Sequence, residues 1–333
     1  YVPRVHRHAI PLRFSRRRTA DVGIYNIARL TANPRLPLLP VYQLLKQWEL
    51  DRSHPARPSK PLLPLMSQAS PIKNSGHRPT TDNLDANASK KKFGKYYTPF
   101  EASRILTNWA IQSAGDRILE PSFGACGFLE AAKERLQELG SSEPMQQVYG
   151  CDIDPEAFTG HLHPRLGIAE DSDRYLNRNF LSLTLQDFGG KPFTAAIGNP
   201  PYVSYHNMDE QTRLAAKALT EDDETGFASA ASLWAYFVRH SMAFLGEEGR
   251  MAWILPSSFL FADYAQSVRE EVRLSFEKSL IIQLRERLFL SEGTEEITAV
   301  LLADGYQPNR SDSGELKLSF ADDLGDLSAV VDE

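Results

Sequence analysis

The sequence from Phe100 onward predicts a doubly wound, mostly parallel α/β sheet of the Rossmann-like class. Short apolar runs of strand length alternate there with longer helical patterns. Several of these runs also end in acidic or amide residues, which is typical of open α/β sheets whose strand ends face a ligand. The expected strands cover 118–119, 148–149, 195–197, 251–254, 280–283 and 298–302.

The first strand, 118–119, follows a helix expected over 100–114 and ends in the acidic residue Glu120. A turn that contains Gly124 then opens a second helix over 128–139. Glycine lets the backbone approach a ligand closely, and the Glu120 carboxylate can meet a cationic group. The turn differs from the G-x-G-x-x-G pattern of dinucleotide-binding proteins.

The second strand ends in Asp152, at a position where an acid typically binds ribose hydroxyls. Asp154 and Pro155 then form the expected start of another helix, with proline in its first position. Glu120 and Asp152 together suit S-adenosylmethionine, which carries a sulfonium, an amino group and a ribose. The alternative for Asp152 is an ordinary carboxylate at the end of a strand.

The tetrapeptide Asn199-Pro200-Pro201-Tyr202 directly follows the buried strand Phe193–Gly198. Two consecutive prolines end a strand and make a stiff loop, because neither donates an N–H. Such a loop suits the exocyclic amine of adenine, a poor nucleophile whose lone pair is delocalised into the ring. The Asn199 side-chain oxygen and the Pro200 carbonyl could accept its two hydrogens, and Tyr202 could stack on the flipped base.

A purely structural role is the alternative for this tetrapeptide. It would be a Pro-Pro turn in which Asn199 satisfies its own hydrogen bonds and Tyr202 packs into the core. The companion motifs favour the catalytic interpretation over this one.

The order of these motifs resembles that of N6-adenine DNA methyltransferases in which the cofactor motif precedes the catalytic Asn-Pro-Pro-Tyr. The resemblance covers about Lys90 to Gly305. Its parts, in chain order, are Lys95-Tyr-Tyr-Thr-Pro-Phe100, the Glu120 turn, Asp152, Asn179-Phe-Leu181, Asn199 to Tyr202, Ser232-Leu-Trp-Ala-Tyr-Phe237, and Gly249-Arg-Met-Ala-Trp-Ile-Leu-Pro-Ser-Ser-Phe259.

The resemblance implies S-adenosylmethionine as the cofactor, a class I methyltransferase fold and no metal. The residues expected to bind the cofactor are Tyr97, Thr98, Glu120, Gly124, Asp152, Ile153, Asn179 and Phe180. The catalytic residues expected are Asn199, Pro200 and Tyr202. Phe289 is the candidate for a second base-stacking aromatic residue, with core packing as its alternative.

Two positions depart from the family pattern. The family usually has Asp where Asn179 stands, and it usually has Phe-Asp where the chain has Phe193-Thr194. An asparagine at 179 can still bond the cofactor adenine, but it brings a donor as well as an acceptor. Neither departure touches the chemistry expected of Asn199.

The implied function is a site-specific DNA methyltransferase that modifies N6 of a flipped adenine within a restriction-modification system. A rival function is methylation of a protein glutamine at N5, since that family also uses Asn-Pro-Pro-Tyr. That family lacks the Tyr97-Thr98-Pro99 segment and the element around Trp234. Two more functions stay open, namely methylation of an RNA base and an inactive subunit that only binds the cofactor.

Composition fits a globular chain that works in a reducing compartment. Hydrophobic residues make up 42% of the 333 residues, and no apolar run reaches transmembrane length. Two cysteines, Cys126 and Cys151, provide neither a disulfide framework nor a metal set. We therefore expect a cytoplasmic protein without a metal ion or a membrane partner.

The chain divides into three expected parts. Residues 1–89 form a disordered or spurious extension, 90–305 the catalytic domain, and 306–333 an acidic tail that begins a missing recognition domain. Residues 1–65 are expected to be translated from upstream of a true start at Met66, with a basic DNA-holding arm as the alternative. Residues 204–231 are expected to form a mobile flap beside the DNA.

Charge is divided unevenly along the chain. Residues 1–98 carry 18 Lys and Arg against 5 Asp and Glu, although the whole chain has a net charge of −6. The catalytic domain is therefore acidic and a poor phosphate binder by itself. The expected partners are double-stranded DNA, a specificity subunit or C-terminal recognition domain, and a restriction endonuclease of the same system.

Overall fold

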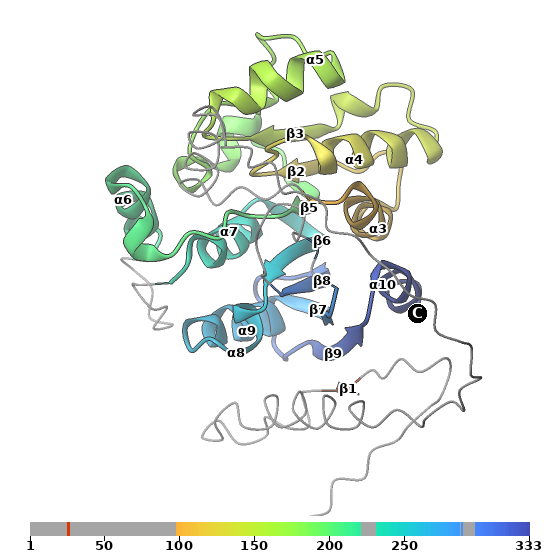
Figure 1. Cartoon of the computed structure of the whole chain (residues 1–333), viewed down its shortest axis with the longest axis vertical. Helices are drawn as coiled ribbons and strands as arrows, with labels where there is room; N and C mark the ends of the chain where they lie inside the picture. The colour runs from red at the N-terminus through yellow and green to blue at the C-terminus, as the bar shows by residue number, and fades with distance from the viewer. Residues whose placement is uncertain (1–24, 27–97, 221–230, 287, 289–296) are drawn as a thin grey trace, which may run out of the picture.

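The described part of the chain forms one mixed sheet with helices on both faces (Figure 1). The structure is a computed structural model that describes residues 25–26, 98–220, 231–286, 288 and 297–333. The strands are β1 (Tyr25–Asn26), β2 (Ile118–Glu120), β3 (Val148–Cys151), β4 (Tyr175–Leu176), β5 (Phe193–Gly198), β6 (Leu245–Pro256), β7 (Phe276–Leu284), β8 (Thr298–Tyr306) and β9 (Glu315–Ala321).

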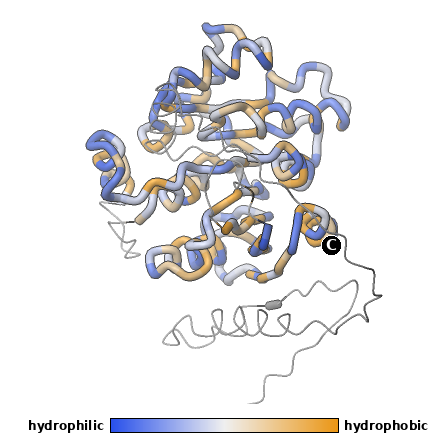
Figure 2. Tube along the Cα trace, in the orientation of Figure 1, coloured by the Kyte–Doolittle hydropathy of each residue, from blue (hydrophilic) through white to orange (hydrophobic). Residues whose placement is uncertain are grey.

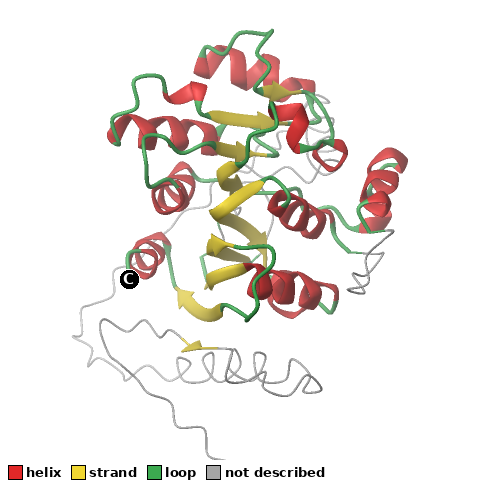
Figure 3. Ribbon diagram, turned by 180° about the vertical axis from the view of Figure 1, so that it is seen from behind, coloured by secondary structure: helices red, strands yellow, loops and turns green. Residues whose placement is uncertain are grey.

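The helices connect these strands and flank the sheet (Figure 3). They are α3 (Phe100–Ala110), α4 (Gly127–Glu138), α5 (His163–Leu166), α6 (Glu210–Ala218), α7 (Leu233–Met242), α8 (Ser258–Phe261), α9 (Tyr264–Ser275) and α10 (Leu324–Val331). A π-helix over Ala157–Leu162 runs directly into α5, and short 3-10 helices lie at Pro144–Gln146, Phe180–Ser182, Leu185–Phe188 and Tyr205–Asn207.

The strand order is β1-β9-β7-β8-β6-β5-β2-β3-β4. β2 lies parallel to both β3 and β5, while β8 is antiparallel to β6 and β7. The chain leaves β2 toward β3 and β4 and then returns to β5 on the other side of β2. The carboxyl ends of β2 and β5 are therefore the topological switch point, where ligands of open α/β sheets bind.

Two hydrophobic clusters cover the two faces of the sheet, which confirms the predicted doubly wound fold. Adjacent residues of β5 divide between them, with Ala195 in the cluster of α3, α4 and α10 and Ala196 in the cluster of α7 and α9. This alternation is the two-residue period of a strand that is buried on both faces. Figure 2 shows hydrophobic stretches in the strands and on the helices that flank them.

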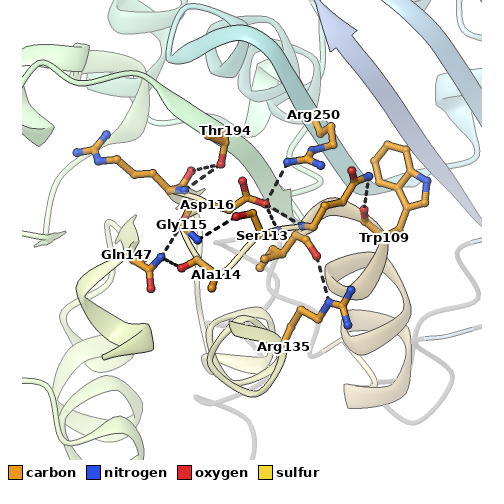
Figure 4. Close-up of polar contacts among 12 residues, drawn as sticks. Trp109, Ser113, Ala114, Gly115, Asp116, Arg135, Gln147, Thr194 and Arg250 are labelled. Atoms are coloured by element: carbon orange, nitrogen blue, oxygen red, sulfur yellow. Dashed lines mark hydrogen bonds and ion pairs between the residues drawn. The ribbon is translucent and has the colours of Figure 1, made fainter. Parts of the chain in front are cut away.

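Helix α3 ends at Ala110, four residues before its predicted end, because Asp116 holds the following loop. The Asp116 Oδ2 atom accepts hydrogen bonds from the Gln112 and Ser113 amides at 2.8 and 3.0 Å. The same oxygen lies 3.0 Å from Nη2 of Arg250 in β6, and both side chains are buried (Figure 4). This ion pair ties the start of β2 to β6, below the switch point.

Thr194, the second residue of β5, belongs to the same network (Figure 4). Its hydroxyl accepts from the Arg117 amide at 2.9 Å and donates to the Arg117 carbonyl at 3.2 Å. The Arg117 guanidinium in turn stacks over the rings of Tyr149 and Phe193 at 3.9 and 4.0 Å. Thr194, which stands where the family usually has Asp, therefore aligns β5 with the segment that leads into β2.

Residues 306–333, which were expected to form an acidic tail, contribute a strand and a helix to the same sheet and its flanking layer. β9 pairs with β7 and buries Leu316, Leu318 and Phe320, which alternate along the strand. Helix α10 buries Leu327 and packs on α3. The domain boundary predicted at 305 therefore lies inside the sheet. The short, partly acidic stretch 315–321 did not predict a strand, but it pairs with the edge of β7.

Two predicted segments lie largely or partly outside the described residues. Of the extension 1–89, the structure describes Tyr25–Asn26, which form β1 antiparallel to β9. Within the expected flap, 221–230 is not described, and the preceding part contains α6. Among the described residues, no helix has both the length and the apolar character needed to cross a membrane.

Candidate active site

A cavity of about 490 Å³ opens at the carboxyl ends of β2, β3 and β5, at the switch point. Its volume lies in the range of small-molecule sites. Eight residues predicted from the sequence line this cavity together: Thr98, Glu120, Gly124, Asp152, Ile153, Asn179, Phe180 and Asn199. Tyr97 and Phe289 lie outside the described residues.

Glu120 ends β2 with a carboxylate that is 2% exposed, and its Oε2 atom has no hydrogen-bond partner. The Leu129 amide donates to this carboxylate. Burial, and then the charge of Asp152, hold the pKa of Glu120 well above its ordinary value. A buried carboxylate with an unpaired oxygen favours a cationic ligand, which would supply the missing countercharge.

Asp152 follows β3 and holds the glycine-containing turn. Its Oδ2 accepts from the Gly124 amide at 2.9 Å, and its Oδ1 accepts from the Asp154 amide at 2.8 Å. Gly124 has a φ of 47°, which glycine adopts without steric cost. Ile153 beside it is 47% exposed on the cavity wall, so an apolar part of a ligand could cover it.

The helix predicted after Asp154 begins with Pro155 and continues into the π-helix and α5. Arg165 of α5 reaches back to the turn, donating to the Ala125 carbonyl at 2.7 Å and to Glu130 Oε2 at 2.7 Å. Arg165 therefore holds the glycine-containing turn after β2 in place. No sequence pattern predicted this role for Arg165. Burial raises the pKa of both thiols, Cys126 and Cys151, which keeps them protonated.

Asn179 and Phe180 follow β4 along the chain and line the cavity. The Asn179 Oδ1 atom accepts from the Leu181 amide at 3.1 Å, which caps the short helix Phe180–Ser182. Phe180 is buried against Phe237 and Phe244, with ring centroids 5.2 and 5.1 Å away. Phe180 therefore lines the cavity from within the core.

Asn199 directly follows β5 and contacts Thr98 in the wall of the cavity. Its Nδ2 donates to Thr98 Oγ1 at 3.1 Å, which leaves Oδ1 buried without a hydrogen-bond partner. Ser122 Oγ donates to the Asn199 backbone carbonyl at 3.4 Å. Gly198 before it has a φ of 150°, and a Cβ there would lie 3.3 Å from the Trp253 ring. The loop is thus held on both sides.

Pro200 and Tyr202 do not line this cavity, whereas Pro201 does. Pro200 is buried, and the Tyr202 hydroxyl donates to the Ile254 carbonyl at 3.2 Å. The Tyr202 ring is half-buried and packs on both hydrophobic clusters. Its predicted stacking on a base stays a prediction.

Further cavity residues were not predicted from the sequence. Leu233 and Phe237 come from α7, inside the motif already noted, and so could have been found. Asp209 and Thr212 come from the N-cap and the first turn of α6, within the expected flap. The Asp-x-x-Thr spacing signals a helix cap, and nothing in it points to a ligand. Among the described residues, no group of three or more His, Cys, Asp or Glu could hold a metal ion.

Comparison with known proteins is consistent with this site. A family model described as N-6 DNA methylase matches residues 83–312. The type II methyltransferase M.AccI of Acinetobacter calcoaceticus is 26% identical over 207 residues, 60% of this chain and 35% of the relative. M.XamI of Xanthomonas campestris pv. amaranthicola is 28% identical over 185 residues, 53% and 32% of the two chains. The chain thus spans about a third of the length of these relatives.

Solved structures show the same fold. The methyltransferase subunit of a type I restriction-modification system from Streptococcus thermophilus has a TM-score of 0.53 at 19% identity, covering 75% of this chain and 55% of that one. A putative class I S-adenosylmethionine-dependent methyltransferase from Listeria monocytogenes has a TM-score of 0.51 at 18% identity, covering 75% and 74%. The fold is therefore that of class I methyltransferases.

Proposed function

The chain belongs to the N-6 DNA methylase family, and we propose on that basis that it methylates N6 of adenine in DNA. The observation that carries the proposal is the Asn199 Oδ1 atom, a buried acceptor in the cavity without a hydrogen-bond partner. A buried acceptor of this kind costs free energy unless a ligand pairs with it. The amine of a flipped adenine offers the donor that Oδ1 lacks.

S-adenosylmethionine is the cofactor that the cavity fits best. The unpaired Glu120 carboxylate suits a cationic group, and Asp152 lies where α/β proteins bind ribose hydroxyls. Ile153 and Phe180 provide apolar walls for the base. The cofactor supplies a methyl group that its sulfonium activates for transfer.

Asn199 would prepare the acceptor nitrogen. Its Oδ1 accepts one hydrogen of the adenine amine and thereby draws the nitrogen lone pair out of conjugation with the ring. The Pro200 carbonyl is proposed as the second acceptor. Thr98 fixes the asparagine amide, because its hydroxyl accepts from Nδ2 at 3.1 Å and so turns Oδ1 toward the cavity.

The target base needs a wall in addition to these acceptors. Tyr202 is the proposed stacking partner, and the Ile254 carbonyl anchors its hydroxyl at 3.2 Å. An anchored ring loses little further freedom when a base stacks on it, which favours binding. Phe289 stays a second proposed partner on sequence grounds alone.

Double-stranded DNA is the proposed substrate, within a restriction-modification system. The names of M.AccI and M.XamI, both type II methyltransferases, support this assignment. A specificity subunit or further recognition domain and a restriction endonuclease are the proposed partners. Base-specific recognition needs side chains at base edges, and the described site offers a pocket with few such groups.

The proposal is tested by separating binding from transfer. Asn199→Ala should lower the methylation rate by about 10²–10³-fold, the usual effect of removing one positioned hydrogen-bonding group. The affinity for S-adenosylmethionine, measured by calorimetry on the full chain, should change little, because Asn199 faces the acceptor. An equal loss of cofactor affinity and rate would place Asn199 in the cofactor site and contradict the assignment.

A further inference from the structure

The Asn179 side chain makes hydrogen bonds within the protein from both ends of its amide. Its Oδ1 accepts from Leu181, and its Nδ2 donates to Thr212 Oγ1 at 3.3 Å. Thr212 belongs to α6, which starts in the segment inserted between the catalytic loop and α7. The amide therefore joins the cavity-lining segment beyond β4 to α6, through Thr212, which lies 33 residues further along the chain.

The hydrogen bonds continue from Thr212 to Asp209. The Thr212 hydroxyl donates to Asp209 Oδ2 at 3.0 Å, and the Thr212 amide donates to Asp209 Oδ1 at 2.8 Å. Thr212, in the middle of this connection, is only 5% exposed, whereas Asp209 at its end is exposed. Asn179, Thr212 and Asp209 all line the cavity.

The order of donors in this chain of bonds explains why asparagine suits position 179. Thr212 donates its only hydroxyl proton to Asp209, so its oxygen needs a donor from the other side. An amide nitrogen supplies that donor, whereas a carboxylate at 179 could not. A carboxylate would also place a second negative charge one hydroxyl away from Asp209.

We propose that Asn179 positions α6, and that Thr212 and Asp209 complete the cofactor pocket at its base-binding end. The inference rests on the proposed function. Asn179 follows β4, one strand beyond the Asp152 ribose position, so a purine attached to that ribose would point toward α6. The Asp209 carboxylate keeps lone pairs that can accept from the exocyclic amine of an aminopurine.

The decisive experiment measures the affinity of the full chain for S-adenosylmethionine by calorimetry. Asn179→Asp should weaken binding about tenfold, because it removes the donor to Thr212 and adds a charge beside Asp209. Adding Asp209→Asn to Asn179→Asp should recover part of this loss. If Asn179 instead contacted the cofactor base directly, Asn179→Asp would bind more tightly, and that result would overturn the proposal.

Variants of Thr212 test the positioning step with a matched control. Thr212→Val should weaken cofactor binding several-fold, and Thr212→Ser should recover it because the hydroxyl returns. The same threonine-to-valine change at Thr220, beyond the other end of α6 and outside the cavity, should leave affinity unchanged. Equal affinities for Thr212→Val and the parent chain would overturn the inference.

A second measurement needs no cofactor. Amide hydrogen exchange in the free protein should be faster over 210–218 in Thr212→Val than in the parent chain or Thr212→Ser, because α6 loses its contact with Asn179. Unchanged exchange would remove Asn179 and Thr212 as positioning residues. If the parent chain bound no S-adenosylmethionine, the proposed function and the pocket assignment would both fail, while the exchange result would still report whether the α6 contact exists.

Discussion

Replacing Thr98 by valine isolates the contact that orients the Asn199 amide. Valine keeps the shape of threonine but removes Oγ1, the acceptor that lies 3.1 Å from Asn199 Nδ2. The Nδ2 group would then be left without its partner in a partly buried position. Leaving such a donor unpaired costs about 1–3 kcal/mol, which favours rotation of the amide by half a turn.

The rotated amide presents a donor where the adenine amine needs an acceptor. Only the fraction of molecules with Oδ1 in the cavity could react, so the cost of about 1–3 kcal/mol corresponds to a loss of about 5- to 150-fold in the rate of methyl transfer. Asn199→Ala sets the upper limit of this effect at about 10²–10³-fold. The expected order of rates is therefore parent chain, then Thr98→Val, then Asn199→Ala.

Single-turnover methylation of DNA with saturating S-adenosylmethionine measures the rate of methyl transfer, and calorimetry measures cofactor affinity separately. Thr98→Ser is the matched control, because it restores the hydroxyl and should recover the rate. The orienting role of Thr98 is refuted if Thr98→Val loses cofactor affinity while its saturated rate stays equal to that of the parent chain. Thr98 would then contact the cofactor alone, as the family resemblance by itself implies.

Charges in and around the site give three more predictions. Burial raises the pKa of the Glu120 carboxyl in the folded protein. The protonated carboxyl therefore contributes fully to the free energy of unfolding below the unfolded pKa of about 4.3, and this contribution is lost as pH rises through the folded pKa. Without cofactor at pH 8, Glu120→Gln should therefore have a higher melting temperature than the parent chain, and it should bind S-adenosylmethionine more weakly. A lower melting temperature of Glu120→Gln at pH 8 would contradict the presence of an uncompensated buried charge at Glu120. Asp116→Ala removes the partner of buried Arg250 and the acceptor for two loop amides. Urea unfolding should therefore show that the free energy of unfolding falls by about 3–5 kcal/mol. A fall of less than about 1 kcal/mol would contradict the proposed link between β2 and β6. Because acidic residues predominate after residue 98, residues 66–333 alone should bind DNA weakly in fluorescence anisotropy, with a steep salt dependence and little sequence preference. Tight binding of residues 66–333 to one short motif would show that recognition resides in this part of the chain.

Much of the site could be predicted because it depends on strand ends. Glu120, Asp152 and Asn199 each follow a short apolar run, and parallel strands bring their carboxyl ends to one edge of the sheet. The order of motifs then indicated the cofactor class. These inferences needed only local sequence and one rule of α/β topology.

The remaining features depend on contacts between distant residues. The Asp116 carboxylate, which holds the loop after α3, is itself held by Arg250, 134 residues away. Residues 315–321 form β9 because β7 offers a free edge, although the segment itself is short and partly acidic. The Asn179–Thr212 contact likewise joins two segments whose patterns show only helix caps.

The identity of the methylated product tests the proposed function most directly. The full chain would be incubated with methyl-labelled S-adenosylmethionine and DNA, both duplex and single-stranded, in parallel with Asn199→Ala as the matched control. After digestion, mass spectrometry would identify the labelled nucleosides, and labelled amino acids would be sought in protein added to the same reaction. We predict that the parent chain forms N6-methyladenine in the DNA and that Asn199→Ala forms it about 10²–10³-fold more slowly. Label on cytosine, label on a protein glutamine, or adenine methylation by Asn199→Ala at the rate of the parent chain would contradict the role assigned to this site.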